Sequence, residues 1–230
     1  PKDVQNQIVR SITKSAPRIT NYVGNGLEHH ENGVNNIRAV PCIEGIVGAY
    51  DVKGGTLIPE FFTTRQLTLY DENPLKHIEP IGAKKYPVLY DIRKECHTLM
   101  GMDTILSGEP YPLKGMIISG ANPVLTNPNS EKVVKALKSL DLLVVRDLFM
   151  TGTTELADYV LPAASYFERT ELYTHAQHQI AGLTKRLFSI PEVQDEYQFL
   201  HDLAHRLGFG DLFPWENEEA LNEWLVEPTG

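Results

Sequence analysis

Hydrophobic residues near the start of the chain recur first at a helical spacing and then as a short strand-like run. Val4, Ile8 and Ile12 share one face of a predicted short helix, and Pro17 ends it. The β-branched and aromatic residues of segment 18–24 then predict a strand. The chain therefore opens with a helix followed by one extended element.

A glycine-rich turn and a second helix follow this strand. The turn covers 24–33, and apolar residues recur at helical spacing through 33–50. Asn32 is placed to cap this helix, and Pro41 predicts a kink within it. Together with the preceding strand, these segments form one strand-turn-helix unit.

Segment 51–115 has a different character, because prolines and glycines interrupt every candidate element in it. It predicts one helix near 91–101 and otherwise an extended, irregular excursion. A long irregular segment inside a compact domain is usually functional or covers a neighbouring surface.

Regular alternation returns in the second half of the chain. Strands are predicted at 115–120 and 141–147, with an amphipathic helix over 130–140 between them and a further short strand at 159–165. Strand, helix and strand at this spacing make a βαβ unit with parallel strands. The continuous apolar runs suit strands covered on both faces. The fold class is therefore α/β, with Rossmann-like βαβ layers on a parallel sheet and helices on both faces.

The last part of the chain predicts a C-terminal helical extension. Segment 170–180 is irregular in pattern, whereas 195–208 and 217–226 each carry an amphipathic helix. Gly208 is placed to end the first of these helices, and Asn217 to cap the second.

Charge and composition narrow the range of partners. The net charge is −9 and no apolar run approaches the about 20 residues of a membrane helix. Binding to a nucleic-acid backbone draws on clustered lysine and arginine, so neither nucleic acid nor direct membrane insertion is expected. No targeting segment is evident, and the compartment stays open between cytoplasm and periplasm.

The cysteines and histidines give little sign of a metal centre. Cys42 and Cys96 lie too far apart in sequence for a zinc or cluster motif, so they are interpreted as buried thiols. His201 and His205 are four residues apart on one helical face, but the glutamate of a zinc-protease motif is missing between them. They are interpreted as surface histidines, and no metal ligand is predicted in this chain.

The strand ends carry the most informative polar residues. Ligands of open parallel sheets bind beyond the carboxyl ends of the strands, where Gly120, Asn122 and Asp147 are expected. Glycine permits close approach of a ligand, and a carboxylate can bind a vicinal diol or the paired N–H donors of a purine. These residues suit a nucleotide. The alternative is that Asp147 only caps the turn that follows its strand.

Several motifs read as a series resemble one family. They are "GLEHHENGVNNIRAVPCIEGIVGAYDVKGGT", "GANP", "VVRDLFMTGTTELADYVLPAASYFERTE" and "DEYQFLHDLAHRLG". In this series the chain resembles the molybdopterin oxidoreductases of the dimethyl sulfoxide reductase family, which bind molybdenum or tungsten through two pyranopterin guanine dinucleotides. The resemblance implies that 1–54 is the end of one dinucleotide-binding α/β domain, 55–114 a connecting excursion, and 115–230 a second such unit with C-terminal helices.

The resemblance also implies roles for individual residues. Asn25, Gly26 and His29 on the first glycine turn would approach a pterin or its phosphates. Gly120 and Asn122 would lie against the dinucleotide, and Arg146 and Asp147 would hold the guanosine. Two further positions, Arg169 and Asp195, match cofactor-contact positions of the family. Catalytic residues cannot be assigned, because the metal ligand of the family precedes the region that this chain resembles.

The function implied is the cofactor-binding portion of an oxidoreductase that acts on a small substrate such as formate, nitrate or a sulfur compound. The chain is expected to be an internal fragment, inactive alone, whose partners are the remainder of the enzyme or an electron-transfer subunit. A [4Fe–4S] centre would belong only to a missing N-terminal region. Two alternatives stay open: a catalytically silent structural relative, as in a respiratory complex, and a stand-alone guanine-nucleotide-binding domain.

Overall fold

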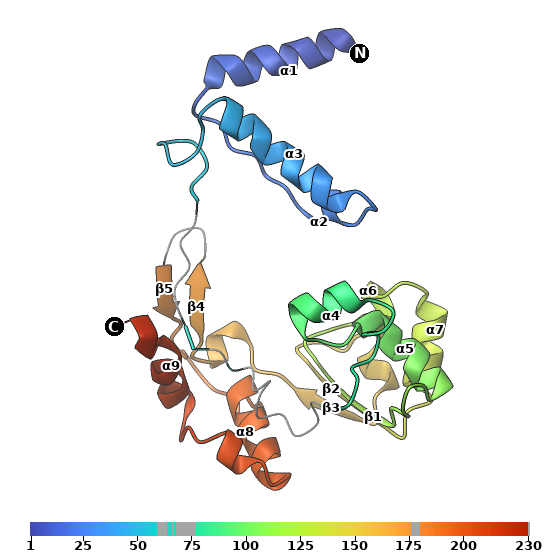
Figure 1. Ribbon diagram of the computed structural model, residues 1–230. Helices are drawn as coiled ribbons and strands as arrows, with labels where there is room; N and C mark the ends of the chain where they lie inside the picture. Colours follow the sequence, from blue (N-terminus) through green and yellow to red (C-terminus); the bar gives the residue numbers. More distant parts are fainter. Residues whose placement is uncertain (59–63, 66, 68–76, 176–179, 230) are drawn as a thin grey trace. The chain divides into compact units, whose positions relative to one another are not determined.

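The computed structural model describes residues 1–58, 64–65, 67, 77–175 and 180–229 (Figure 1). The chain divides into two compact units. The first unit comprises Pro1–Thr63 with Tyr173–Gly182, and the second comprises Thr64–Leu172 with Leu183–Gly230. None of the described helices has the length and hydrophobicity needed to cross a bilayer.

The first unit is built from helices α1 (Lys2–Ser15), α2 (Asn25–Glu28) and α3 (Gly33–Ile46). The strand predicted over 18–24 is wrong, because this segment is extended but joins no sheet. The backbone N–H of Asn21 donates instead to Glu44 Oε1 at 2.9 Å, and the hydroxyl of Thr56 donates to the same oxygen at 2.7 Å. The buried carboxylate of Glu44 thus accepts a backbone hydrogen bond that a neighbouring strand would otherwise accept.

Glu44 is only 4% exposed, and its two donors bind it in its ionised form. Burial alone would raise the pKa of this carboxyl, but the hydrogen bonds from Thr56 and Asn21 lower it below its ordinary value. Val34 and Ile43, two of the apolar residues that recur at helical spacing, are exposed on α3. The buried residues of this helix are Gly33 and the charged Glu44.

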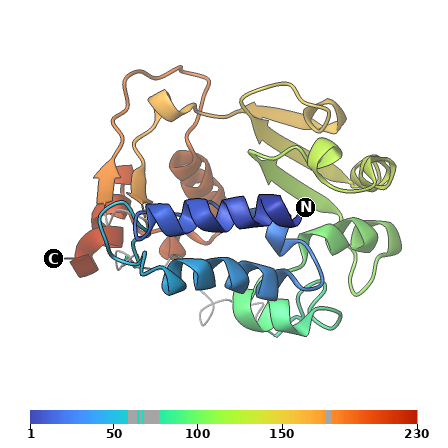
Figure 2. The ribbon, with the colours of Figure 1, turned by 90° about the horizontal axis from the view of Figure 1, so that it is seen from above.

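The second unit contains a parallel three-stranded sheet in the order β1-β2-β3. The strands are β1 (Gly115–Ser119), β2 (Leu142–Asp147) and β3 (Tyr159–Pro162), which confirms the predicted βαβ unit. Helix α7 (Ser130–Leu137) connects β1 and β2, and α5 (Thr98–Ser107) packs beside it (Figures 1 and 2).

The hydrophobic core lies between this sheet and the α5 and α7 pair. It joins Met102 of α5 and Leu137 of α7 to Ile118, Leu143 and Val145 of the strands. Side chains alternate between the two faces of a strand, so Arg146 points to the opposite face. There its guanidinium carbon lies 4.5 Å from the ring centre of Phe199 on α8 (Glu196–Arg206). The α/β class with a parallel sheet is thus confirmed. Helices α5 and α7 cover one face, whereas on the other face α8 reaches Arg146 and Ile117 is exposed.

Two local elements differ from the sequence predictions. The single helix expected near 91–101 is two helices, α4 (Pro87–Arg93) and α5, because Lys94 adopts a left-handed conformation with φ of 55°. The segment expected to be irregular near 170–180 instead contains β4 (Leu172–His175) and β5 (Ile180–Leu183), which form a two-stranded sheet. Gly182 lies against the ring of Tyr173, where any larger residue would collide.

The C-terminal helical extension is confirmed. Helix α8 begins at its cap Asp195, whose Oδ1 accepts from the N–H of Gln198 at 2.8 Å. Helix α9 (Glu218–Val226) is capped by Asn217, whose Oδ1 accepts from the N–H of Ala220 at 2.9 Å. A short helix, α6 (Pro123–Thr126), completes the turn after β1.

Candidate dinucleotide-binding edge

The carboxyl ends of β1 and β2 lie side by side. Ser119 pairs with Arg146 in the parallel register, and the N–H of Gly120 donates to Arg146 O at 2.9 Å. Continuing this register by one residue places Gly120 next to Asp147. Two of the predicted site residues are therefore neighbours at one edge of the sheet.

Gly120 is the position at this edge where glycine is required. Its φ is +63°, a conformation that L side chains rarely adopt, and no atom lies within 4 Å of the place where a Cβ would stand. The chain turns sharply at the end of β1 and leaves open space over its backbone. A ligand can therefore approach the main chain closely here.

Asn122 is held in one orientation by a buried hydroxyl. Thr153, which is fully buried, donates from Oγ1 to Asn122 Oδ1 at 2.7 Å and accepts from the N–H of Val124 at 3.2 Å. Among the described residues, none accepts a hydrogen bond from the amide nitrogen of Asn122. The Asn122 side chain thus has a fixed oxygen and an available N–H pair.

Asp147 ends β2 and begins a tight turn. Its Oδ1 accepts from the N–H of Phe149 at 3.1 Å, while the described part of the chain supplies no partner for Oδ2. The capping role considered from the sequence is therefore real, but it uses one oxygen only. The side chains of Leu148, Phe149 and Met150 that follow are exposed and apolar.

Arg146 is placed differently from its neighbour. Its side chain is 2% exposed; Nη1 donates to Ser119 Oγ at 3.1 Å and Nη2 donates to Gln194 O at 2.8 Å. Its Nη1 also lies 3.7 Å from Glu196 Oε1. The guanidinium therefore joins β1, β2 and the start of α8 from within the protein.

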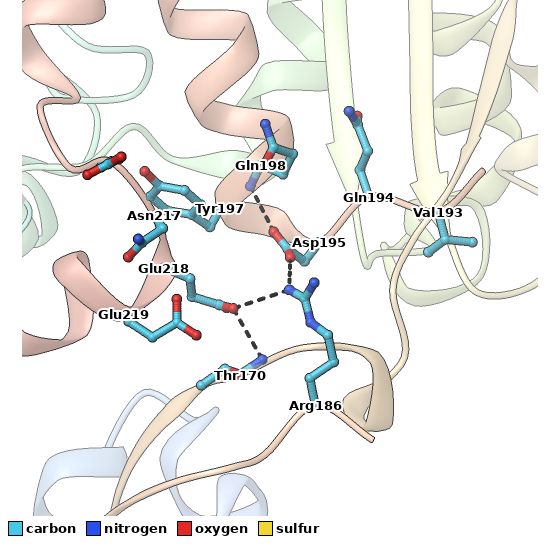
Figure 3. Close-up of a pocket in the computed structure, with 11 residues that line it drawn as sticks. Thr170, Arg186, Val193, Gln194, Asp195, Tyr197, Gln198, Asn217, Glu218 and Glu219 are labelled. Carbon is cyan, nitrogen blue, oxygen red and sulfur yellow. Dashed lines mark hydrogen bonds and ion pairs between the residues drawn. The ribbon is translucent and has the colours of Figure 1, made fainter. Parts of the chain in front are cut away.

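Asp195 lies beyond the third strand and lines a polar cavity of about 360 Å³ (Figure 3). Arg169 precedes Thr170 of this lining, and its own side chain lines a neighbouring hollow. Ala163 forms a parallel bridge with Gln194, which continues the sheet past β3 towards Asp195. Arg169 donates to Glu196 Oε2 at 2.7 Å. Burial would lower the pKa of Arg169, but the carboxylates of Glu196 and Glu171 raise it above its ordinary value.

Figure 3 shows Arg186 reaching two carboxylates across this cavity. Its Nη2 lies 2.5 Å from Asp195 Oδ2 and 3.4 Å from Glu218 Oε2, and the N–H of Thr170 donates to the same Glu218 oxygen. Burial raises the pKa of Glu218, and the negative charge of Asp195 raises it further. The charge of Arg186 and the hydrogen bond from Thr170 offset part of this effect.

The first glycine turn forms part of the first unit. Asn25 and Gly26 begin the short helix α2, and His29 follows it with an exposed side chain. The ring of His30 approaches Gly26 O, with Nε2 at 2.9 Å. A Cβ on Gly26 would meet no atom within 4 Å, so the backbone of this turn is accessible.

These observations can be compared with known proteins. The sequence model described as molybdopterin oxidoreductase matches residues 3–206, which is most of the chain. The chain belongs to the molybdopterin oxidoreductase family. The resemblance seen in the sequence motifs is therefore confirmed.

Comparison with individual relatives shows what share of their length this chain covers. It is 26% identical over 210 residues to F420-dependent formate dehydrogenase 1 subunit alpha of Methanococcus maripaludis, covering 89% of this chain and 31% of that protein. It is 30% identical over 201 residues to the probable oxidoreductase YoaE of Bacillus subtilis, covering 86% and 28%. The chain thus spans less than a third of the length of these relatives.

A solved member of the family has the same fold. Acetylene hydratase from Pelobacter acetylenicus superimposes with a TM-score of 0.70 over 86% of this chain and 31% of that structure, at 23% identity. This likeness supports the α/β fold class of the molybdopterin oxidoreductase chain.

The histidines and cysteines of the described segments add no metal centre, and the cysteines correct one expectation. Within the described ranges, no three histidine, cysteine, aspartate or glutamate side chains are arranged to hold a metal ion. The rings of His201 and His205 are adjacent, with centroids 4.2 Å apart. Cys42 and Cys96 are both exposed, so the prediction of buried thiols is wrong. Cys42 lies within α3, where its Sγ–H donates to Arg38 O at 3.2 Å.

The sequence interpretation missed the residues that support the edge. Thr153, Arg186 and Gln194 touch predicted site residues, yet none of them was singled out. Only Thr153 had a usable signal, because it lies in the polar run "TGTTE" directly after the β2 turn. Arg186 and Gln194 reach the site through tertiary contacts that no local pattern reports.

Proposed function

We propose that this chain is a cofactor-binding portion of a molybdenum or tungsten oxidoreductase, and that the carboxyl edge of β1 and β2 binds the guanosine end of a molybdopterin guanine dinucleotide. The observation that carries the proposal is the adjacency of Gly120 and Asp147 at this edge. An open backbone and a carboxylate with one oxygen available lie together there.

The chemistry of these groups fits guanosine. A carboxylate oxygen accepts from the N1–H or N2–H donors of guanine, and the same oxygen can accept from a ribose hydroxyl. The oriented amide of Asn122 can donate to a phosphate or a ring carbonyl. Arg146 then acts as a positioning residue, since its donors bind Ser119 and Gln194.

The remaining predicted contacts stay part of the proposal. Asn25, Gly26 and His29 of the first unit would approach a pterin or its phosphates. Arg169, and Asp195 in the cavity of Figure 3, would contribute further contacts to the dinucleotide. When bound, the molybdenum or tungsten pterin supplies two-electron redox chemistry, while the protein binds and orients it. Substrates of the formate, nitrate or sulfur-compound class, and an electron-transfer partner, belong to this proposal.

Binding of guanosine diphosphate to the 230-residue chain tests the edge directly. Calorimetry or nuclear magnetic resonance is expected to detect GDP binding that ADP does not match, because adenine lacks the paired donors that face a carboxylate. Asp147→Ala should weaken GDP binding by about tenfold or more, equivalent to the loss of one charge-assisted hydrogen bond.

Asp141→Ala is the matched control. Asp141 lies at the opposite, amino end of the same strand, where it pairs on the surface with Lys114 at 3.4 Å. Its removal should leave GDP binding unchanged. Equal loss in the two variants, or equal binding of ADP and GDP, would contradict the assignment of the edge.

The cofactor itself is tested on the whole protein that contains this chain. Anaerobic purification followed by metal analysis and by assay of guanine nucleotide released from the denatured protein should detect molybdenum or tungsten together with GMP. If neither a metal nor a pterin is found, the silent structural relative replaces the oxidoreductase. GDP binding by the chain without pterin in the whole protein would instead support the guanine-nucleotide-binding domain.

A further inference from the structure

Helices α8 and α9 and the loop between them border an apolar groove. Of the residues in the proposed function, Arg169 alone lines it, in its second hollow. Its first part is a hollow of about 570 Å³, lined by Leu200, Phe209, Phe213, Trp215 and Trp224 among others. A second hollow of about 330 Å³ continues it and shares Leu67, Leu200 and Phe213. The two hollows together are called the α8/α9 groove below.

A buried amide without a partner lies in the wall of this groove. Asn222 of α9 is 7% exposed, and no described residue accepts a hydrogen bond from its Nδ2. Asn222 lines the second hollow. Buried polar groups are nearly always hydrogen-bonded, so an N–H donor in this position calls for an oxygen acceptor.

The end of the chain that forms the groove is strongly acidic. After Arg206 it carries Asp211, Glu216, Glu218, Glu219, Glu223 and Glu227 and no lysine or arginine. Asp211 lies in the lining of the first hollow. Aromatic walls next to carboxylates suit an apolar ligand that also carries positive charge.

A segment of the chain itself already docks on α9 in this way. The guanidinium of Arg65 lies 5.0 Å from the ring centre of Trp224 and pairs with Glu227. The backbone N–H of Arg65 donates to Leu225 O at 2.9 Å, and Leu67 reaches the groove two residues later. A basic residue followed by an apolar one is therefore a sequence that this surface accommodates.

We propose that the α8/α9 groove binds a peptide segment of a partner protein that presents apolar side chains flanked by lysine or arginine, with a main-chain carbonyl that accepts from Asn222. The apolar side chains would fill the space beside Trp215 and Phe213, as in other helix or strand docking grooves. The positive flanks would face Asp211. This surface acts in partner binding whether or not the carboxyl edge of the sheet holds a dinucleotide.

The two tryptophans make the groove directly observable. The chain has only Trp215 and Trp224, and both line the first hollow. A short synthetic amphipathic peptide of leucine and lysine should change their fluorescence in a saturable way. The same peptide with glutamate in place of lysine should bind at least about tenfold more weakly, and a peptide of the same composition with scrambled spacing should also lose affinity.

Three variants test the individual contacts. Asp211→Lys should weaken binding of the basic peptide by about three- to tenfold. Glu131→Lys makes the same charge change at an exposed residue of α7 and should leave this binding unchanged. Asn222→Leu should weaken binding by about fivefold, the loss of one neutral hydrogen bond, while urea unfolding of the variant stays cooperative.

Other occupants give other results. The proposal would be overturned if the lysine and glutamate peptides bound with equal affinity and if Asp211→Lys left that affinity unchanged. A tryptophan shift that depends on protein concentration without peptide, matched by dimers in sedimentation, would assign the groove to a second copy of the chain and also overturn it. Binding of a small apolar dye that no peptide displaces would assign it to a small ligand.

Discussion

Replacing Arg146 with methionine tests whether this residue holds the second unit together. Arg146 is 1% exposed, and its guanidinium connects Ser119, Gln194 and the ring of Phe199. Methionine keeps an unbranched apolar chain against Phe199 but removes every donor. The variant therefore leaves the Gln194 carbonyl without its 2.8 Å partner.

The expected loss of stability follows from these contacts. Hydrogen bonds from a charged donor contribute about 1.5–3 kcal/mol each, and the guanidinium over an aromatic ring adds about 1 kcal/mol. Part of this is offset, because burying the guanidinium costs several kcal/mol that methionine avoids. Glu196 still accepts a hydrogen bond from Arg169 at 2.7 Å, so the variant leaves its carboxylate with a charged partner. We expect a net loss of about 3 kcal/mol in the free energy of unfolding.

Urea unfolding followed by tryptophan fluorescence measures this loss, because both tryptophans belong to the second unit. Lys114→Met is the control: it removes a surface pair with Asp141 whose side chains are 73% and 69% exposed, and should cost less than about 1 kcal/mol. A loss below about 1 kcal/mol for Arg146→Met, or one equal to the control, would refute the positioning role.

Three further outcomes are expected. Gly120→Ala should lower the free energy of unfolding by about 1 kcal/mol, because residue 120 has a φ of +63°. Gly120→Asn should lower it less, since asparagine tolerates this conformation. Urea unfolding midpoints compare the two variants, and equal losses would contradict the backbone argument. Glu218→Gln should stabilise the chain at pH 7, because the folded-state pKa of Glu218 is raised, and the gain should disappear as the pH falls towards its ordinary value of 4.5; a gain that persists at low pH would exclude titration as its cause. Cys42 and Cys96 should both react with a thiol reagent in the native chain without denaturant, whereas reaction only after unfolding would contradict their exposure.

The fold was predictable where the residues of the hydrophobic pattern are also the buried ones. The apolar runs of β1 and β2 and the stripe of α7 meet in one core, so periodicity alone located them. Segment 18–24 has the composition of a strand, but Glu44 provides its backbone partner from a helix more than twenty residues away. Residue type reports a preference for extended backbone and does not reveal which group satisfies the backbone hydrogen bonds.

Arg146 and Asp147 are adjacent in sequence, and the motif that they share suggested a common role at the nucleotide. Neighbouring residues of a strand point to opposite faces, which the pleat imposes whatever the motif. Asp147 ends the strand with one carboxylate oxygen available, whereas the Arg146 side chain is buried against α8 and Phe199. We infer that the pair divides two tasks between its members: Asp147 faces the ligand edge, and Arg146 fixes β1, β2 and the cap of α8 behind it. In the proposed site, the order of the two residues along the strand, and not the motif as a whole, decides which of them can contact the guanosine.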